Sequence, residues 1–507
     1  MNLTIRPLDA VAVGLYLAVM LTIGFVSARR STKAEHYFVG HRNFPGWLVG
    51  LSLLGSIVSS TTFLALPAAA YVLDWRQLTV NLAMPVVGIV AIVIFIPFFR
   101  RAGLTSTFEY LAERFGGGAR LYCTGSFIVL QLIRLAIVLF LVALPMQFLT
   151  AARLEWVIVG CGVFVALYAL VGGMETVLWA NAVQATIKIA GGMLCLGCLL
   201  VKLPGGFGQV LQVGRAHDKF SLGSFAWDVH ARTFWTVAIL GVVNWLHIYS
   251  GEQTVVQRYV SARSTREARK ATMLFACVAL PTWTMFFFLG TSLFVFFQVL
   301  PDPAVLKLQP EQVLPYFVFK QVPTGLAGMI IAAVLAAAMS ALDSGVNSIA
   351  TVVVVDVLKP YLARGREDRF YLRAARVVTA VGLSLAVIGA LIFSRLEKES
   401  MNDVSLILLS VLGGCIMGVY MLGFFTRRVD GFSVNVALGV AVALNVYFAL
   451  GLMHVLPARW TSNIHSYWVG PSVNGVFMVT AYGISVVRRK PQAALPGLTV
   501  WTSSGLR

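Results

Sequence analysis

The sequence predicts an all-α integral membrane protein with thirteen transmembrane helices. Of its 507 residues, 58% are hydrophobic and only 12% are charged, and its mean hydropathy is +0.83. This composition leaves too few polar side chains to cover the surface of a water-soluble chain of this length. Because about 20 apolar residues cross a bilayer as a helix, the chain can form a dozen or so crossings joined by short loops. Disordered proteins, nucleic-acid-binding modules and disulfide scaffolds are excluded.

Thirteen apolar segments follow one another, each bounded by charged residues or by Gly and Pro. They lie at 9–29, 46–73, 78–100, 121–150, 154–171, 176–201, 233–254, 272–299, 323–355, 372–394, 404–425, 431–454 and 467–487. The first should remain as a membrane anchor, since Arg29 and Arg30 close it and no small-residue cleavage site follows. We expect one transmembrane domain over 1–490 and a short, unfolded tail over 491–507.

The positive charges predict the orientation. If the loop after the first segment is cytoplasmic, the loops on that side and the C-terminus carry roughly twice as many Lys and Arg residues as the opposite loops. The net charge of +18 therefore reflects topology rather than binding to nucleic acid. The sequence predicts a multi-pass protein of the plasma (inner) membrane with its N-terminus outside and its C-terminus in the cytoplasm.

Two of the thirteen segments lose their apolar pattern midway. The second contains Ser and Thr at 56, 59, 60, 61 and 62 and then Pro67, while the seventh contains Asn244, His247, Tyr249 and Glu252. Irregular backbone at membrane depth is tolerated where it lines a cavity, so paired interruptions point to the binding site of a transporter. Their spacing of five segments predicts inverted repeats, helices 2–6 and 7–11, with broken helices 2 and 7. A kink caused by Pro and Ser/Thr alone is the alternative.

Six ordered passages, at 36–53, 59–67, 108–116, 172–177, 252–259 and 336–348, resemble the solute:sodium symporter family over nearly the whole chain. The resemblance implies the fold of the leucine-transporter type and secondary active transport by alternating access. It implies no particular solute, because the family includes carriers of sugars, sialic acid, proline, pantothenate, iodide and monocarboxylates.

The resemblance also implies where Na⁺ would bind. The main site would use backbone carbonyls of Gly55, Val58 and Ala337, the hydroxyl of Ser340 and a hydroxyl at position 341, where this chain has Ala341. A second site in some members uses an aspartate at position 181 and hydroxyls on the ninth helix. This chain instead has Asn181, Asp343 and Ser344, so the carboxylate has changed helices. Because a carboxylate inside the membrane is costly, Asp343 is a candidate ion ligand, and a structural hydrogen bond to a neighbouring helix is the alternative.

Lys188 lies near the centre of the sixth apolar segment, on the same helical face as Asn181 and Gln184. A buried ammonium needs a partner, which could be Asp343 or a substrate anion. Alternatively, Lys188 is itself the cation, tethered in place of sodium, or it is solvated at a cavity wall. We expect sodium coupling, with a proton-coupled or sodium-independent carrier as the alternative.

Arg134 lies deep inside the fourth apolar segment, and its guanidinium suits a bidentate contact with a carboxylate. Among members of the family, sialic-acid carriers have an arginine at the matching position and hydroxyls at those of Ser59 and Thr62. Asn81, Asn244 and Tyr249 complete the candidate substrate residues. The solute would be a sugar, a carboxylated sugar or another small organic acid. The alternative is that Arg134 caps backbone carbonyls.

An enzyme is not expected, because no cluster of His, Asp or Cys with catalytic spacing is present. Neither an organic cofactor nor a nucleic acid is implied, and Na⁺ is the one expected ion. The expected partners are the lipid bilayer and a small-molecule solute, and the sequence leaves the oligomeric state open.

Overall fold

The computed structural model describes residues 6–28, 38, 40–102, 104–169, 173–396, 401–453, 455–488 and 495–502. Across these residues the chain is helical, with one isolated parallel bridge between Phe44 and Ala262 and no strand. The helices of the first half are α1 (Pro7–Ala28), α3 (Gly46–Ile57), α4 (Leu66–Val72), α5 (Thr79–Leu82), α6 (Met84–Val90), α7 (Ile96–Ala102), α8 (Thr107–Phe115), α9 (Gly117–Thr150), α10 (Leu154–Ala169), α11 (Met174–Lys202) and α12 (Gly206–Ala216). Those of the second half are α13 (Phe234–Gly251), α14 (Gln253–Ser261), α15 (Thr265–Val299), α16 (Pro310–Gln321), α17 (Leu326–Val352), α18 (Asp368–Phe393), α19 (Met401–Leu412), α20 (Ile416–Phe425), α21 (Gly431–Leu452) and α22 (Val469–Val487).

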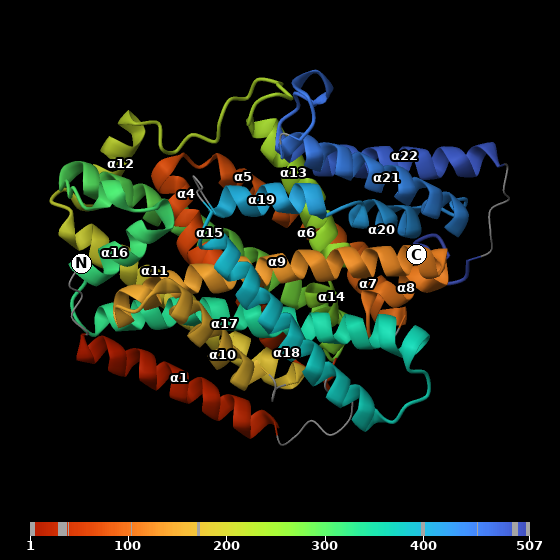
Figure 1. Ribbon diagram of the computed structural model, residues 1–507, viewed down its shortest axis with the longest axis horizontal. Coiled ribbons are helices and arrows are strands. Elements are labelled where there is room, and N and C mark those ends of the chain that lie inside the picture. The colour runs from red at the N-terminus through yellow and green to blue at the C-terminus, as the bar shows by residue number, and fades with distance from the viewer. Residues whose placement is uncertain are drawn as a thin grey trace.

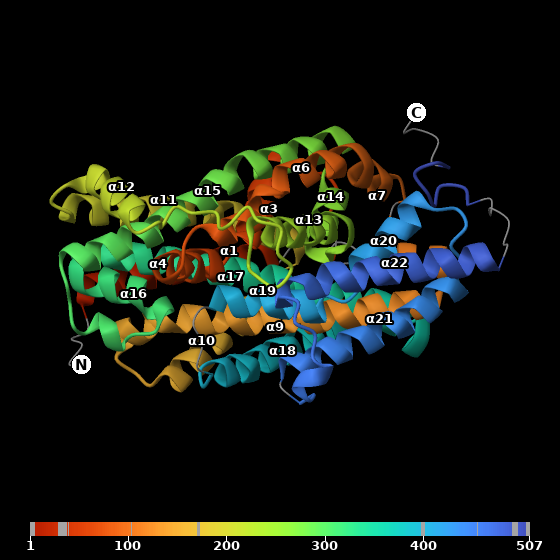
Figure 2. The same ribbon diagram turned by 90° about the horizontal axis from the view of Figure 1, so that it is seen from above.

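The described chain is a bundle of membrane-length helices (Figure 1). Nine continuous helical spans in it are long and apolar enough to cross a bilayer. Two further pairs qualify as bent spans, α3 with Thr61–Val72 at 59° and α19 with α20 at 53°, and two shorter apolar helices lie at Pro7–Ile23 and Leu154–Leu167. The predicted all-helical membrane architecture is confirmed at this level. Figures 1 and 2 agree in placing α21 and α22 side by side at one edge.

Helix α17 forms the centre of the bundle and continues as a π-helix over Val353–Leu362. It packs against α1, α3, α9 and α11, and nearly all of its residues are buried. Ala, Gly and Ser dominate its sequence between 332 and 345. Because lipid supplies no hydrophobic drive between helices, such small side chains favour association by letting backbones approach closely. The polar residues of α17 therefore face neighbouring helices rather than lipid.

The second apolar segment is broken, as predicted. Helix α3 ends at Ile57, Val58 leaves the helical region with φ −75° and ψ 96°, and a π-helical turn follows over Thr61–Ala65. The Ser60 hydroxyl donates to Val138 O on α9 at 2.9 Å, which anchors the irregular stretch. A Cβ at Gly55 would lie 2.4 Å from Asn181 O, so glycine is what lets α3 touch α11 here.

The seventh segment breaks later than its polar residues suggested. Helix α13 runs to Gly251 without interruption, Glu252 is extended with ψ 111°, and the buried helix α14 follows. Polar side chains such as Asn244 are tolerated inside α13 because their backbone groups keep their helical hydrogen bonds. A further bend, between α19 and α20, was not predicted. It lies at Gly413 and Gly414, and Gly414 has φ +57°.

The end of the chain packs against the bundle over residues 495–502. Val500 N donates to Phe424 O at 3.0 Å, Trp501 Nε1 donates to Phe425 O at 2.9 Å, and the Tyr110 hydroxyl donates to Leu498 O at 3.0 Å. For this stretch the structure differs from the unfolded tail expected from composition, because its backbone and indole groups meet carbonyls at the end of α20. The expected boundary at 490/491 lies outside the described residues.

Candidate functional site

A cavity of about 230 Å³ lies between the broken segment α3–α4 and helices α9, α13 and α19. Its polar lining consists of Ser59, Thr61, Thr62, Gln77, Asn81, Gln131, Arg134, Asn244, His247, Glu252, Thr254, Asn402 and Ser405. Apolar and aromatic side chains, among them Ile57, Trp245 and Trp283, complete the walls. A cavity that combines apolar and aromatic walls with convergent polar groups is typical of a site for a small molecule.

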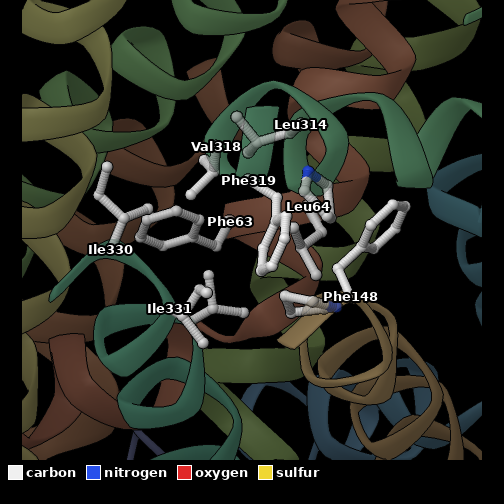
Figure 3. Close-up of a pocket in the computed structure, with 11 residues that line it drawn as sticks. Phe63, Leu64, Phe148, Leu314, Val318, Phe319, Ile330 and Ile331 are labelled. Carbon is white, nitrogen blue, oxygen red and sulfur yellow. The ribbon is translucent and has the colours of Figure 1, made fainter. Parts of the chain in front are cut away.

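A second cavity lies on the other side of the broken segment and differs in kind. Figure 3 shows Phe63 and Leu64 facing Leu314, Phe319 and Ile331, and all eleven of its lining residues are apolar. Its volume is about 10 Å³, which is at the lower limit for a single water molecule. This gap is a packing defect between α16 and α17, so the polar cavity is the candidate solute site.

Arg134 projects from α9 into the polar cavity and is partly buried. Its one hydrogen bond to a described residue runs from Nη2 to Ser56 O, at 3.3 Å. That carbonyl belongs to the last turn of α3, so the guanidinium contacts the C-terminal end of the broken helix. A single long contact leaves most of its five N–H donors available to a ligand in the cavity.

The structure brings most of the candidate substrate residues together. Ser59, Thr62, Asn81 and Asn244 line the same cavity as Arg134. Tyr249 does not: its ring packs against Trp245 at a centroid distance of 5.6 Å, and its hydroxyl lies beside Gly88 of α6. Because α13 stays helical past position 249, that side chain points to a neighbouring helix instead of entering an unwound stretch.

Several lining residues were not among the sequence candidates. Gln77 comes from the 3-10 turn Arg76–Leu78, and Asn402 and Ser405 come from the first turns of α19. His247 and Glu252 were recognised only as polar interruptions of the seventh segment and were not assigned to the solute site. A carboxylate inside an apolar segment is the sequence signal that could have identified Glu252 as a cavity residue.

The predicted main ion site is built around Lys188. The fully buried ammonium donates to Gly55 O, to Val58 O at 2.7 Å and to Ser340 Oγ at 2.6 Å. The break after Ile57 frees those carbonyls, and the close approach at Gly55 brings α11 within reach. Three of the five expected sodium ligands therefore hold the lysine, and none of its three hydrogen bonds goes to Asp343.

The remaining two expected ligands do not add oxygen around the ammonium. Ala337 O instead accepts from Ser340 Oγ at 3.2 Å, and the Ala341 side chain is a methyl group. The Ser340 hydroxyl thus accepts one hydrogen bond from Lys188 and donates one within its own helix. The centre is satisfied as it stands, with an ammonium in the position that the resemblance assigns to Na⁺.

The residues expected at a second ion site also come together, but around Ser344. Its hydroxyl accepts from Asn181 Nδ2 at 2.7 Å and from Arg258 Nη2 at 2.9 Å, and its single proton is directed to Ser340 O at 2.7 Å, with Asp343 Oδ1 a second acceptor at 3.2 Å. A hydroxyl oxygen has two lone pairs, and both are used here. This arrangement leaves Ser344 no free electron pair for an ion.

Arg258 is a second resident cation in this centre. It is fully buried, and it also donates to Ser52 Oγ at 3.0 Å and to Thr254 O at 2.5 Å. With Lys188 and Asp343 it gives a buried group of two cations and one carboxylate. A metal ion added to that group would bring a third positive charge into a region of low dielectric, which is costly.

A bundle with a helix broken at mid-depth, a polar cavity at the break and a cation beside it defines a membrane carrier. Comparison with known sequences agrees: the model of the Sodium:solute symporter family matches residues 37–432. The chain belongs to this family. It is a transport protein of the membrane and not an enzyme.

Named relatives cover nearly the whole chain. The Sodium/sialic acid symporter NanT of Aliivibrio fischeri is 31% identical over 94% of this chain and 92% of its own length. The Sodium/sialic acid symporter SiaT of Proteus mirabilis is 28% identical over 90% of each chain. The Sodium/iodide cotransporter of Homo sapiens is 30% identical over 85% of this chain and 67% of its own length.

Solved structures show the same fold. A substrate-bound, outward-open Na⁺-coupled sialic acid symporter matches with a TM-score of 0.85 and 26% identity, covering 96% of this chain and 99% of that one. The nucleobase-cation-symport-1 transporter Mhp1, in a closed conformation, matches with a TM-score of 0.58 and 14% identity over 91% of this chain and 96% of its own. The latter likeness concerns the fold alone.

Proposed function

We propose that this protein is a secondary active transporter that carries a small, polar, carboxylated solute by alternating access, with Na⁺ as the coupling ion. The observation that carries the proposal is the cavity at the broken helix with Arg134 in its wall. Na⁺ is supported by membership of a sodium symporter family and by the likeness to a Na⁺-coupled carrier. A carboxylated sugar is supported by the sialic acid symporters among the relatives.

The proposal includes thirteen crossings, an external N-terminus and a cytoplasmic C-terminus. Nine continuous spans, two bent spans and two shorter apolar helices in the described residues support that count. The start of α1 and the end of α22 lie at opposite ends of the bundle in Figure 1, as an odd number of crossings requires. Helices 2–6 and 7–11 would form the inverted repeats, since each set opens with a segment that is interrupted, at Val58 and at Glu252.

Arg134→Lys tests the solute anchor. A lysine keeps the charge but cannot reproduce the fork of a bidentate carboxylate contact, so solute affinity should fall by at least about tenfold. Ligand-dependent thermal stabilisation of the purified protein, across sugars and sugar acids, measures it. Arg153→Lys, outside the cavity, is the matched control. Unchanged affinity for every stabilising acid would make Arg134 a structural cap and remove the main support for a carboxylated solute.

A specific observation favours a second candidate for the coupling. The Lys188 ammonium holds Gly55 O, Val58 O and Ser340 Oγ, the oxygens on which a sodium ion would rely. In this candidate the lysine is the resident cation of the main site, and the carrier is sodium-independent or proton-coupled. Ala341 and the saturated Ser344 hydroxyl support it, because each removes a ligand that Na⁺ would need.

Uptake of a stabilising solute into proteoliposomes, measured against Na⁺ concentration at two pH values, separates the candidates. Saturable activation of the parent by Na⁺ supports sodium coupling and excludes the tethered amine. A flat Na⁺ response in the parent, with activation by Na⁺ gained in Lys188→Ala, supports the resident cation. Lys202→Ala, at the end of the same helix α11, controls for the loss of a positive charge.

A further inference from the structure

The polar cavity carries one full charge of each sign. Arg134 enters it from α9, and Glu252 enters it from the break between α13 and α14. Among the described lining residues, no other Arg, Lys, Asp or Glu is present, and His247 is the one further titratable side chain. The two charges come from elements more than a hundred residues apart in sequence. Their meeting at one cavity is a property of the fold that neither segment shows by itself.

The Glu252 carboxylate has room for a cationic partner. Its Oε1 accepts from the Thr254 hydroxyl at 3.0 Å, while Oε2 lies 3.9 Å from His247 Nε2, beyond hydrogen-bond distance. That imidazole nitrogen has no hydrogen-bond partner among the described residues either. Oε2 therefore has no hydrogen-bond donor among the described residues, and its nearest cationic group is the His247 imidazole, which forms an ion pair with it when protonated.

The local backbone explains how a carboxylate can be kept there. Glu252 is extended between two helices, and α14 begins at the next residue. The free amides at the start of α14 favour a negative charge at its first turn. The Glu252 side chain makes no cap hydrogen bond to α14, and the Thr254 hydroxyl is its one hydrogen-bond donor among the described residues, so the carboxylate can accept further hydrogen bonds from a ligand.

We propose that the solute is a zwitterion, whose carboxylate binds Arg134 and whose ammonium group binds Glu252. The inference rests on the proposed function and names the substrate class of the same cavity. With a simple anion bound, the cavity would hold one uncompensated negative charge, whereas a zwitterion brings its net charge to zero. Because an unpaired charge in a desolvated site costs free energy, the cavity should bind a zwitterion more tightly than a simple anion. The amides of Asn81 and Asn244 line the same cavity and can bind hydroxyl groups of the solute.

Two matched pairs of probes test this directly. Glucosaminate and gluconate differ by an amine next to the carboxylate, and 6-aminohexanoate and hexanoate differ by an amine at the far end. Thermal stabilisation of the full-length protein gives an apparent affinity for each probe at pH 7. In the parent, the amine-bearing member of at least one pair should bind about tenfold or more tighter than its partner, as expected of a charge-assisted hydrogen bond.

Variants assign the preference to the two charges. Glu252→Gln should reduce the ratio within that pair to near one, and Glu252→Asp, which keeps the charge, should retain part of it even if the glutamine variant folds poorly. Arg134→Lys should weaken both members of the pair together. Glu155→Gln, an exposed carboxylate on α10, is the control and should change nothing.

The outcomes are distinguishable. Equal binding within both pairs, with Arg134 still required, overturns the zwitterion and leaves the carrier of organic acids intact. A preference for the amine that survives Glu252→Gln overturns the role of Glu252. Absence of stabilisation by either amine-bearing probe at millimolar concentration also overturns the inference. Failure of the proposed function shows differently, as binding of acids that does not depend on Arg134.

Discussion

Replacing Lys188 by alanine should convert a filled centre into an empty sodium site. The change removes three hydrogen bonds from a charged donor, to Gly55 O, Val58 O and Ser340 Oγ. Bonds to charged groups contribute about 1.5–3 kcal/mol each, while relief from burying an ammonium returns several kcal/mol. We expect a net loss of about 1–3 kcal/mol of stability in a buffer of choline chloride.

If Lys188 is the resident cation, the second candidate above, sodium should stabilise the variant but not the parent. At about one hundred times its dissociation constant, an ion that binds only the folded state adds about 2.7 kcal/mol, which is comparable to the expected loss. The assay is thermal unfolding of the detergent-purified parent, Lys188→Ala and Lys202→Ala in choline, K⁺ and Na⁺ at equal ionic strength. Equal stabilisation of parent and Lys188→Ala by Na⁺ would refute the reasoning, because it would show that the ion binds without displacing the amine.

Three further perturbations test the fold around the site. Gly55→Ala should lower stability by about 1–3 kcal/mol, because its Cβ would lie 2.4 Å from Asn181 O, whereas Gly197→Ala, which has open space on α11, should be neutral or stabilising; equal thermal shifts would contradict the close approach of α3 and α11. The Tyr316 hydroxyl donates to Asp302 Oδ2 at 2.6 Å and lowers the pKa of that carboxyl, so the ionised carboxylate stabilises the fold above its ordinary pKa and this contribution is lost as the pH falls through the lowered pKa. The stability of Asp302→Asn should therefore fall less steeply with acid than that of the parent, and an unchanged slope would argue against this loop contact. A reporter fused to Arg507 should be active in the cytoplasm and one inserted at Asp218 outside, and the reverse pattern would overturn the orientation inferred from the basic loops.

The helical membrane architecture was predictable because length and hydropathy set it, and the break at Val58 was predictable because Ser, Thr and Pro interrupt an apolar run. The later break of α13 was not, since Asn244 and His247 are polar yet remain helical when a cavity accepts their side chains. The bend between α19 and α20 rests on two adjacent glycines inside an apolar segment, a pattern that is also common in straight membrane helices.

Part of the candidate site was likewise predictable from the sequence, and part was not. Arg134, Ser59 and Asn81 could be placed in the cavity from their segments and from the family resemblance. The partner of Lys188 could not be chosen from sequence, because Asp343, a substrate anion and the backbone of the broken helix were all compatible with a lysine at that depth. The choice depends on the close approach of α3 and α11 at Gly55, which brings the ammonium within reach of the free carbonyls. The hydropathy of the sequence does not predict this approach.

A cation covalently attached to the transporter returns to its starting side in every cycle. If Lys188 keeps its position, no charge crosses the membrane with it, and a zwitterionic solute adds none. Each sodium ion that moves inward gains about 2.3 kcal/mol per 100 mV of membrane potential. In a carrier with a lysine in place of that ion, the membrane potential contributes no free energy to transport. The solute would then reach equal concentrations on the two sides of the membrane unless a proton moves with it. The current carried per solute molecule thus reports on the chemistry at position 188.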